Sequence, residues 1–123
     1  MPLPPRSFHP LADVAIRWGV TPPVIVDWAI EGKIALSAVL PLVETKQDRP
    51  VEGLVEICSQ DIYRLFDTGA KKTSSVRIQR FRRRARARWE KIVSPAEGIE
   101  LTASGVVITR AEVERFERAC GLV

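Results

Sequence analysis

Apolar residues recur at helical spacing early in the chain and predict a pair of short helices. The first helix covers 11–18, and its apolar face carries Leu11, Val14, Ala15 and Trp18. Gly19 ends this helix, because glycine adopts the left-handed conformation of a helix end at little cost. The second helix begins after Thr21, which can cap it, and has Pro22 at its first position.

Segments rich in β-branched and large apolar residues predict strands in the rest of the chain. These segments are 33–43, 51–58, 99–101 and 106–108. Pro41 has no backbone N–H, so it places the later part of the first strand at a sheet edge or a bulge. We therefore expect a small antiparallel sheet.

Two more helices are predicted, one over 60–68 and one over 110–120. Thr109 caps the last helix, and Glu112, three residues later, completes a capping box. The apolar spacing turns three residues of this helix inward: Val113, Phe116 and Cys120. Its acidic residues are expected on a solvated face: Glu112, Glu114 and Glu117.

The segment 74–93 fits two structures. As a helix, it places five residues on one face: Ile78, Phe81, Ala85, Trp89 and Ile92. As a hairpin, it has strands on either side of a turn at 82–84. Periodicity slightly favours the helix, and the segment lacks the usual turn residues of a hairpin.

The stretch VDWAIEGKIAL resembles the helix-turn-helix of MerR and excisionase proteins, with small Ala15 and turn Gly19 before it. The resemblance implies an α+β fold with an N-terminal helix-turn-helix and a wing strand over 1–43. A small antiparallel sheet with one central helix, a basic hairpin and a C-terminal helix would fill 44–123. An ordinary helical hairpin is the alternative for the first segment.

The C-terminal stretch VVITRAEVERFE is similar to a strand and helix in a group of small, mostly uncharacterised bacterial proteins. That resemblance implies a hairpin rather than a helix over 74–93. It also implies a setting on bacterial chromosomes or mobile elements. Where the group has an acid before the strand, this chain has Ser104 and Gly105.

Composition places the chain among globular proteins of one domain or slightly more. It has 123 residues, of which 46% are hydrophobic and 28% charged. Cys58 and Cys120 are the two cysteines, and they form no CxxC motif. His9 is the single histidine. This pattern argues against a disulfide framework or a zinc site and predicts buried free thiols in a reducing, cytoplasmic compartment. No apolar run approaches the ~20 residues that span a membrane.

Charge is distributed unevenly along the chain. Residues 71–91 contain ten basic residues and one acid, a net charge of +9, whereas the rest of the chain carries −5. A strongly basic segment on a mildly acidic body suggests a polyanionic partner.

Motifs for catalysis are lacking. The sequence has no G-x-S-x-G, P-loop or H-E-x-x-H pattern. His9 falls in a proline-rich, extended N-terminal arm, where we expect it to be exposed. The triplet at 59–61 is more simply a helix cap than a nucleophile. We therefore expect a protein without enzymatic activity, metal or cofactor.

The favoured hypothesis is a DNA-binding regulator or an accessory factor of a bacterial mobile element. Its candidate nucleic-acid contacts are basic: Lys33, Arg77, Arg80, Arg82, Arg83, Arg84, Arg86 and Arg88. The candidate surface of the recognition helix is Pro23, Val24, Asp27 and Glu31. The two acids in that set oppose phosphate binding. RNA is a weaker alternative partner, and a self-associating protein–protein adaptor with a degenerate helix-turn-helix is the alternative function.

Overall fold

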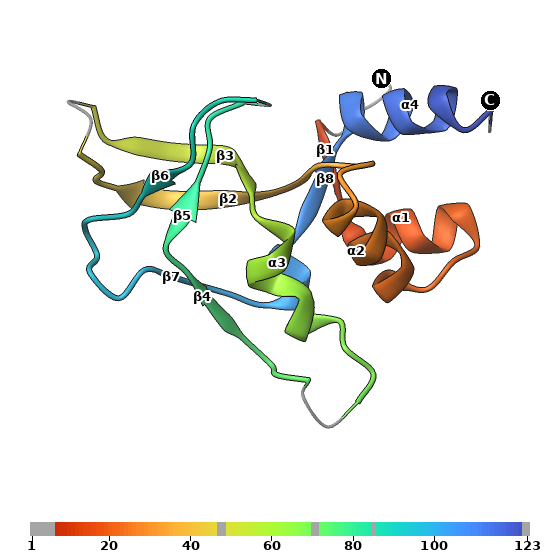
Figure 1. Ribbon diagram of the computed structural model, residues 1–123, viewed down its shortest axis with the longest axis horizontal. Helices are drawn as coiled ribbons and strands as arrows, with labels where there is room; N and C mark the ends of the chain where they lie inside the picture. The colour runs from red at the N-terminus through yellow and green to blue at the C-terminus, as the bar shows by residue number, and fades with distance from the viewer. Residues whose placement is uncertain (1–6, 47–48, 70–71, 85, 122–123) are drawn as a thin grey trace, which may run out of the picture.

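A four-stranded antiparallel sheet is the main element of the structure (Figure 1). The structure is a computed structural model that describes residues 7–46, 49–69, 72–84 and 86–121. The strands lie side by side in the order β1 (Phe8–Pro10), β8 (Val107–Thr109), β2 (Leu36–Val43) and β3 (Val51–Ile57).

Two short sheets and a set of short helices surround the main sheet. Strand β4 (Val76–Ile78) pairs with β7 (Ile99–Leu101), and β5 (Arg80–Phe81) pairs with β6 (Glu90–Lys91). The α-helices are α1 (Leu11–Trp18), α2 (Pro22–Ile30), α3 (Ser59–Ile62) and α4 (Arg110–Ala119), and the 3-10 turns are η1 (Tyr63–Leu65) and η2 (Ala103–Gly105). Across the described ranges, no helix has the length and apolar character to cross a membrane.

Strand β8 lies between two strands from the beginning of the chain. Phe8 of β1 is opposite Thr109, and Ser37 of β2 is opposite Val107. The contact continues past the strand ends, because the Leu11 N–H donates to the Val106 carbonyl at 3.0 Å. Helices α1, α2 and α4 lie at this end of the sheet, while the β5–β6 hairpin lies along β3 toward the other end (Figure 1).

The predicted fold class, with an N-terminal helix-turn-helix and a small sheet around one central helix, is wrong. The sheet dominates, and helices α1 and α2, which lie at the predicted positions, only connect its strands β1 and β2. Helix α2 also packs beside α3 and η1, where Pro23 and Val26 line a small cleft with Tyr63 and Phe66. Local spacing predicted the helices, but the β1–β8 pairing joins residues that are distant in sequence.

Strand β2 shows why the sheet has one apolar face. Leu36, Ala38 and Leu40 alternate into the core, where β3 supplies Val55 and Ile57. The register between the two strands shifts between Leu40 and Val43. Pro41 lies inside that irregularity, which confirms the predicted bulge.

Segment 74–93 contains a hairpin, but its strands differ from the predicted ones. Arg80 is opposite Lys91 and Phe81 is opposite Glu90, whereas Val76–Ile78 pairs with β7 instead. This arrangement buries three apolar side chains of the segment, Ile78, Phe81 and Ile92, to 1% exposure or less, whereas Trp89 remains 38% exposed. Burial therefore determined the pairing even though the turn residues typical of hairpins are missing.

Three aromatic rings join α1, α2 and α4. The Phe116 ring stacks on Trp18 with centroids 4.8 Å apart, and it lies 5.2 Å from the ring of Trp28. Phe116 is buried, while both tryptophans are half-buried at the edge of the core. Phe116 is thus the centre of the contact between the helices.

A buried carboxylate holds the same helices together. Both Glu117 oxygens accept hydrogen bonds from the Arg17 guanidinium, and one also accepts from the Trp18 indole N–H, each at 2.8 Å. The bonds from Trp18 and Arg17 lower the pKa of Glu117 below its ordinary value of 4.5.

The prediction of a solvated acidic face on the last helix is therefore wrong. Glu117 is 5% exposed, because it lies four residues after Val113 and shares the inward face of α4. Glu112 and Glu114 are half-buried and form ion pairs with arginines of the same helix.

Two further predictions need correction. His9 belongs to β1, opposite Ile108, and is half-buried rather than exposed in an arm. Cys58 and Cys120 are free thiols, but Cys58 is half-buried and Cys120 is exposed. Cys120 follows the last residue of α4, so it lies beyond the part of the helix that packs on the core.

Replacing Phe116 with alanine should lower the free energy of unfolding by about 3–5 kcal/mol, because a large ring is removed from a packed site. Urea unfolding followed by far-UV circular dichroism measures the change. Leu42→Ala is the control, since Leu42 is 61% exposed and should lose less than about 1 kcal/mol. Equal losses in the two variants would show that the aromatic contact does not hold α4 in place.

Glu117→Gln should be less stable than the wild type by about 1–3 kcal/mol near neutral pH, because charged hydrogen bonds are lost. A lowered carboxyl pKa contributes stability that is present above 4.5 and is lost as the pH falls through the folded-state pKa. The difference in unfolding free energy between Glu117→Gln and the wild type should therefore shrink as the pH falls below 4.5. Urea unfolding at a series of pH values tests this, and a difference that stays constant would contradict it.

Candidate nucleic-acid interface

The basic residues of the β5–β6 hairpin lie between two buried apolar residues, Phe81 and Ile92. We call residues 82–84 and 86–89 the arginine loop. Phe81 and Ile92, on either side of it, are 0% and 1% exposed, and the Ile92 N–H donates to the Gln79 carbonyl at 2.8 Å. At its start, Arg82 exchanges two backbone hydrogen bonds of 3.0 Å with Glu56, which adds this residue to the edge of β3. The fold therefore presents the loop on a fixed base.

Three arginines of the hairpin are neutralised by acids. Arg80 binds Asp61 through two hydrogen bonds of 2.9 and 3.0 Å. Arg82 pairs with Glu56. Arg83 pairs with Glu90 at 2.7 Å, and its pKa, like that of Arg80, is raised by the hydrogen bond that the guanidinium donates to its carboxylate partner. These predicted phosphate contacts are thus engaged within the chain.

Four other predicted contacts make no ion pair in the described part of the chain. They are exposed: Arg77, Arg84, Arg86 and Arg88. Arg86 has a φ of 66°, and no other residue with a side chain has a positive φ within the described ranges. The left-handed conformation costs a residue with a Cβ about 1–2 kcal/mol. Of these four unpaired residues, Arg84, Arg86 and Arg88 belong to the arginine loop, whereas Arg77 lies on β4.

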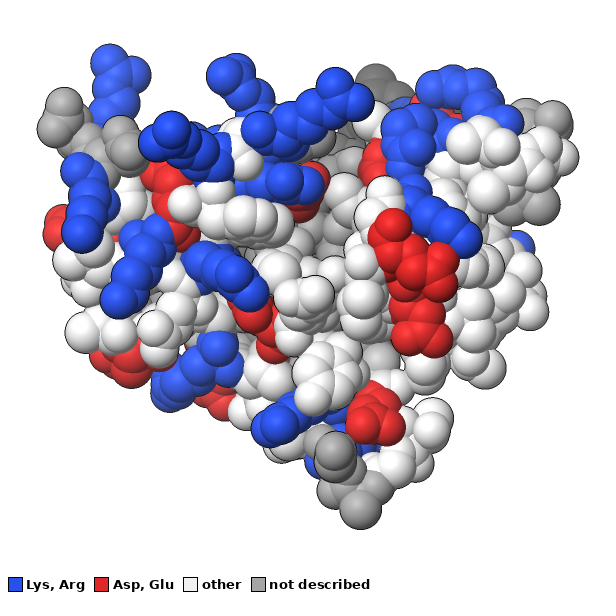
Figure 2. Space-filling view, in the orientation of Figure 1, with Lys and Arg blue, Asp and Glu red and all other residues white. Residues whose placement is uncertain are grey.

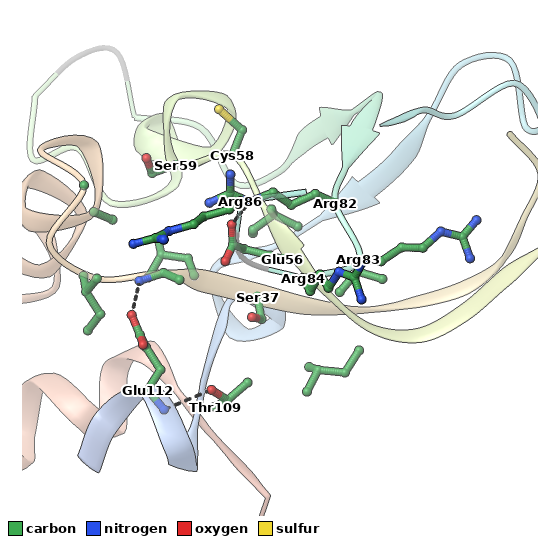
Figure 3. Close-up of a pocket in the computed structure, with 18 of the residues that line it drawn as sticks. Ser37, Glu56, Cys58, Ser59, Arg82, Arg83, Arg84, Arg86, Thr109 and Glu112 are labelled. Carbon is green, nitrogen blue, oxygen red and sulfur yellow. Dashed lines mark hydrogen bonds and ion pairs between the residues drawn. The ribbon is translucent and has the colours of Figure 1, made fainter. Parts of the chain in front are cut away.

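A cleft of about 720 Å³ lies between the arginine loop and helix α4. Its floor is the outward face of β2 and β3, including Ser37, Leu54 and Glu56. Figure 3 shows Arg84 and Arg86 on one side of the cleft, with the start of α4 on the other. Figure 2 shows the same region as a hollow with basic side chains around its upper rim.

The far wall of the cleft is held by Glu112. Its carboxylate accepts the backbone N–H of Ala35 at 2.7 Å and pairs with Arg115, which in turn donates to the Lys33 carbonyl at 2.8 Å. Only half of the predicted capping box forms, with the Thr109 hydroxyl accepting the Glu112 N–H at 3.2 Å. The Glu112 side chain is used instead to join α4 to the start of β2.

Trp89 lines the wall of the cleft that the arginine loop forms, which we call the near wall. The Arg82 guanidinium lies 4.6 Å from its ring centroid and that of Arg80 lies 6.0 Å away, distances typical of cation–π contacts. The indole remains 38% exposed and lines the cleft. An indole fixed by arginines and open to solvent is able to stack on a planar ligand.

The predicted recognition-helix residues lie elsewhere. Pro23 and Val24 are half-buried, while Asp27 and Glu31 are exposed. Lys33, a predicted phosphate contact, pairs with Glu31 at 2.7 Å. Figure 2 shows acidic side chains gathered over α2, next to basic side chains on that side of the hollow. The structure thus brings together the loop arginines and leaves the residues of α2 outside that surface.

Two residues that line the cleft, Leu54 and Arg115, were not identified from the sequence. Leu54 and its cross-strand neighbour Val39 are outward-facing, and the alternation of β2 and β3 could have indicated this. Arg115 carries no local signal, because its place in the cleft depends on how α4 packs.

Among the residues that the structure describes, no cluster of three or more His, Cys, Asp or Glu side chains is arranged to hold a metal ion. Comparisons of the chain with protein-family models, curated proteins and solved structures find no match.

Arg86→Gly should leave the protein at least as stable as the wild type, because glycine adopts a positive φ without strain. Relief of about 1–2 kcal/mol is partly offset by the greater unfolded-state entropy of glycine. Arg86→Ala removes the same charge but keeps the strain, so it should be the less stable variant in urea unfolding. Equal stability of the two variants would show that this backbone conformation is not strained.

Proposed function

We propose that this chain binds nucleic acid without catalysing a reaction, and that the arginine loop makes the phosphate contacts. The observation that carries the proposal is a group of three exposed arginines, Arg84, Arg86 and Arg88, which have no acidic partner among the described residues. The other arginines of the loop are paired. Unpaired guanidinium groups bind phosphate oxygens with charge-assisted hydrogen bonds, often two at a time.

Charge distribution supports the same proposal. The segment 71–91 has a net charge of +9 in a chain whose remainder carries −5. Internal pairs remove only part of that excess, so a positive potential remains over the hairpin. Helix α2, with Asp27 and Glu31 exposed, takes no part in the proposed contact.

The proposed partner is DNA or RNA, and the proposed role is that of a transcriptional regulator or an accessory factor of a bacterial mobile element. The resemblance of the C-terminal VVITRAEVERFE segment to small bacterial proteins supports this setting. Free thiols at Cys58 and Cys120 are compatible with a reducing, cytoplasmic compartment, where we place the protein.

A protein–protein adaptor is the second candidate, favoured by exposed apolar side chains away from the cleft. Ile16 on α1 is 79% exposed, and Ile30, the last residue of α2, is 43% exposed and directly precedes the exposed Glu31. Such a face suits a basic protein partner or the arginine loop of a second copy. Self-association that weakens with salt, in a protein that binds no nucleic acid, would favour this candidate.

Affinity for nucleic acid should depend steeply on salt, and the arginine loop should account for much of that dependence. Fluorescence anisotropy with labelled oligonucleotides over a range of salt concentrations gives the slope of log K against log salt. Changing Arg84, Arg86 and Arg88 together to alanine should reduce the slope on duplex DNA by up to about 2–3 units, since each phosphate contact contributes about 0.9.

A matched control removes the same charge from another part of the surface. Arg64, Lys72 and Arg118 are exposed and do not line the cleft, and their combined change to alanine should alter the slope by less than about one unit. The proposal fails if the wild type binds no nucleic acid, or if the two triple variants lose affinity and slope equally.

A further inference from the structure

We infer that the cleft takes a single-stranded segment of nucleic acid, with its bases against the sheet and its phosphates at the arginine rim. This inference rests on the proposed function and specifies its ligand. Its first support is the floor of the cleft, where Leu54 is 40% exposed. Its direct cross-strand neighbour Val39, on the same sheet face beside the cleft, is 51% exposed. Adjacent large apolar side chains on an open sheet face suit a ligand with apolar faces.

The second support is the position of the charges around that floor. Arg84 and Arg86 lie on the rim, whereas Glu56 and Glu112 lie inside the cleft (Figure 3). Both carboxylates are already paired, Glu56 with Arg82 and Glu112 with Arg115, so the interior offers phosphates little net positive charge. The rim arginines make no ion pair within the described ranges and are open to phosphate oxygens. The phosphates of a ligand are therefore expected at the rim, and its bases are expected deeper.

The third support is Trp89 on the near wall. Its ring is held by Arg82, with 4.6 Å between the guanidinium carbon and the ring centroid, and it still exposes 38% of its surface. A fixed aromatic ring beside a basic rim is the arrangement that stacks an unpaired base and contacts its backbone. In a duplex, the base faces are stacked on one another and cannot make this contact.

The size of the cleft agrees with a short unpaired segment. A volume of about 720 Å³ falls in the range of sites for drug-sized ligands. A duplex would reach the rim arginines but would leave the floor and Trp89 uncovered. The apolar floor should therefore favour a single strand over a duplex. The loop arginines alone would not distinguish the two forms, because both forms have phosphates.

The inference is tested by comparing one short oligonucleotide as a single strand and as a duplex, at the same salt concentration, in DNA and in RNA. The full chain should bind the single strand at least about tenfold more tightly, because only that form adds base stacking to the phosphate contacts. Preference for the RNA or the DNA single strand identifies which polynucleotide the cleft accepts. Equal or tighter binding of both duplexes would overturn the inference while leaving the proposed function intact.

Two matched variants test the floor itself. Leu54→Thr should weaken single-strand binding about fivefold or more, through lost apolar contact, and should leave duplex binding and the salt slope unchanged. Leu42→Thr makes the same chemical change on an exposed residue of β2 outside the cleft and should have no effect. Urea unfolding checks that both variants fold, and the pair Leu54→Ala and Leu42→Ala replaces the threonine variants if Leu54→Thr does not.

The outcomes separate the two proposals. If the Leu54 and Leu42 variants bind the single strand equally well, the floor makes no contact and the inference is wrong. If neither form of nucleic acid binds in a salt-dependent way, the proposed function and the inference both fail. Loss of single-strand preference in Leu54→Thr, together with a retained salt slope, is the result that supports both.

Discussion

The packing of helix α4 depends on two carboxylates that bind across the fold. Glu117 accepts hydrogen bonds from Arg17 and Trp18 of α1, and Glu112 accepts the backbone N–H of Ala35 just before β2. A carboxylate is stable at such depth only when charged or polar donors surround it. These bonds fix one wall of the cleft relative to its floor, so the geometry of the candidate site follows from how α4 is docked.

Local features of the fold could be predicted from the sequence, because they depend on nearby residues. The helix over 11–18, the bulge near Pro41 and the Thr109 cap all follow from spacing or from the chemistry of one residue. The overall architecture could not be predicted in this way. It depends on the pairing of Phe8 with Thr109, and no local pattern specifies which strands meet across that separation.

The candidate site, like the fold, could be predicted from the sequence only where local residues determine it. The density of arginines marked the right segment, but which of them are free depends on acids brought from elsewhere. Asp61 and Glu56 neutralise Arg80 and Arg82, whereas Arg84 meets no acid in the described ranges. Sequence resemblance also directed attention to α2, whose packing against α3 could be seen only in three dimensions. Tertiary contacts therefore decide which charges remain available to a partner.

The position of β8 in the middle of the sheet has a consequence for synthesis of the protein on the ribosome. Strands β1, β2 and β3 are translated first, but within the described part of the chain β1 pairs only with β8 in the main sheet. Until residues 107–109 emerge, β2 presents an unpaired edge, and such edges promote aggregation. Sheet completion is thus a late, long-range step, and it links correct folding of the nascent chain to synthesis of β8.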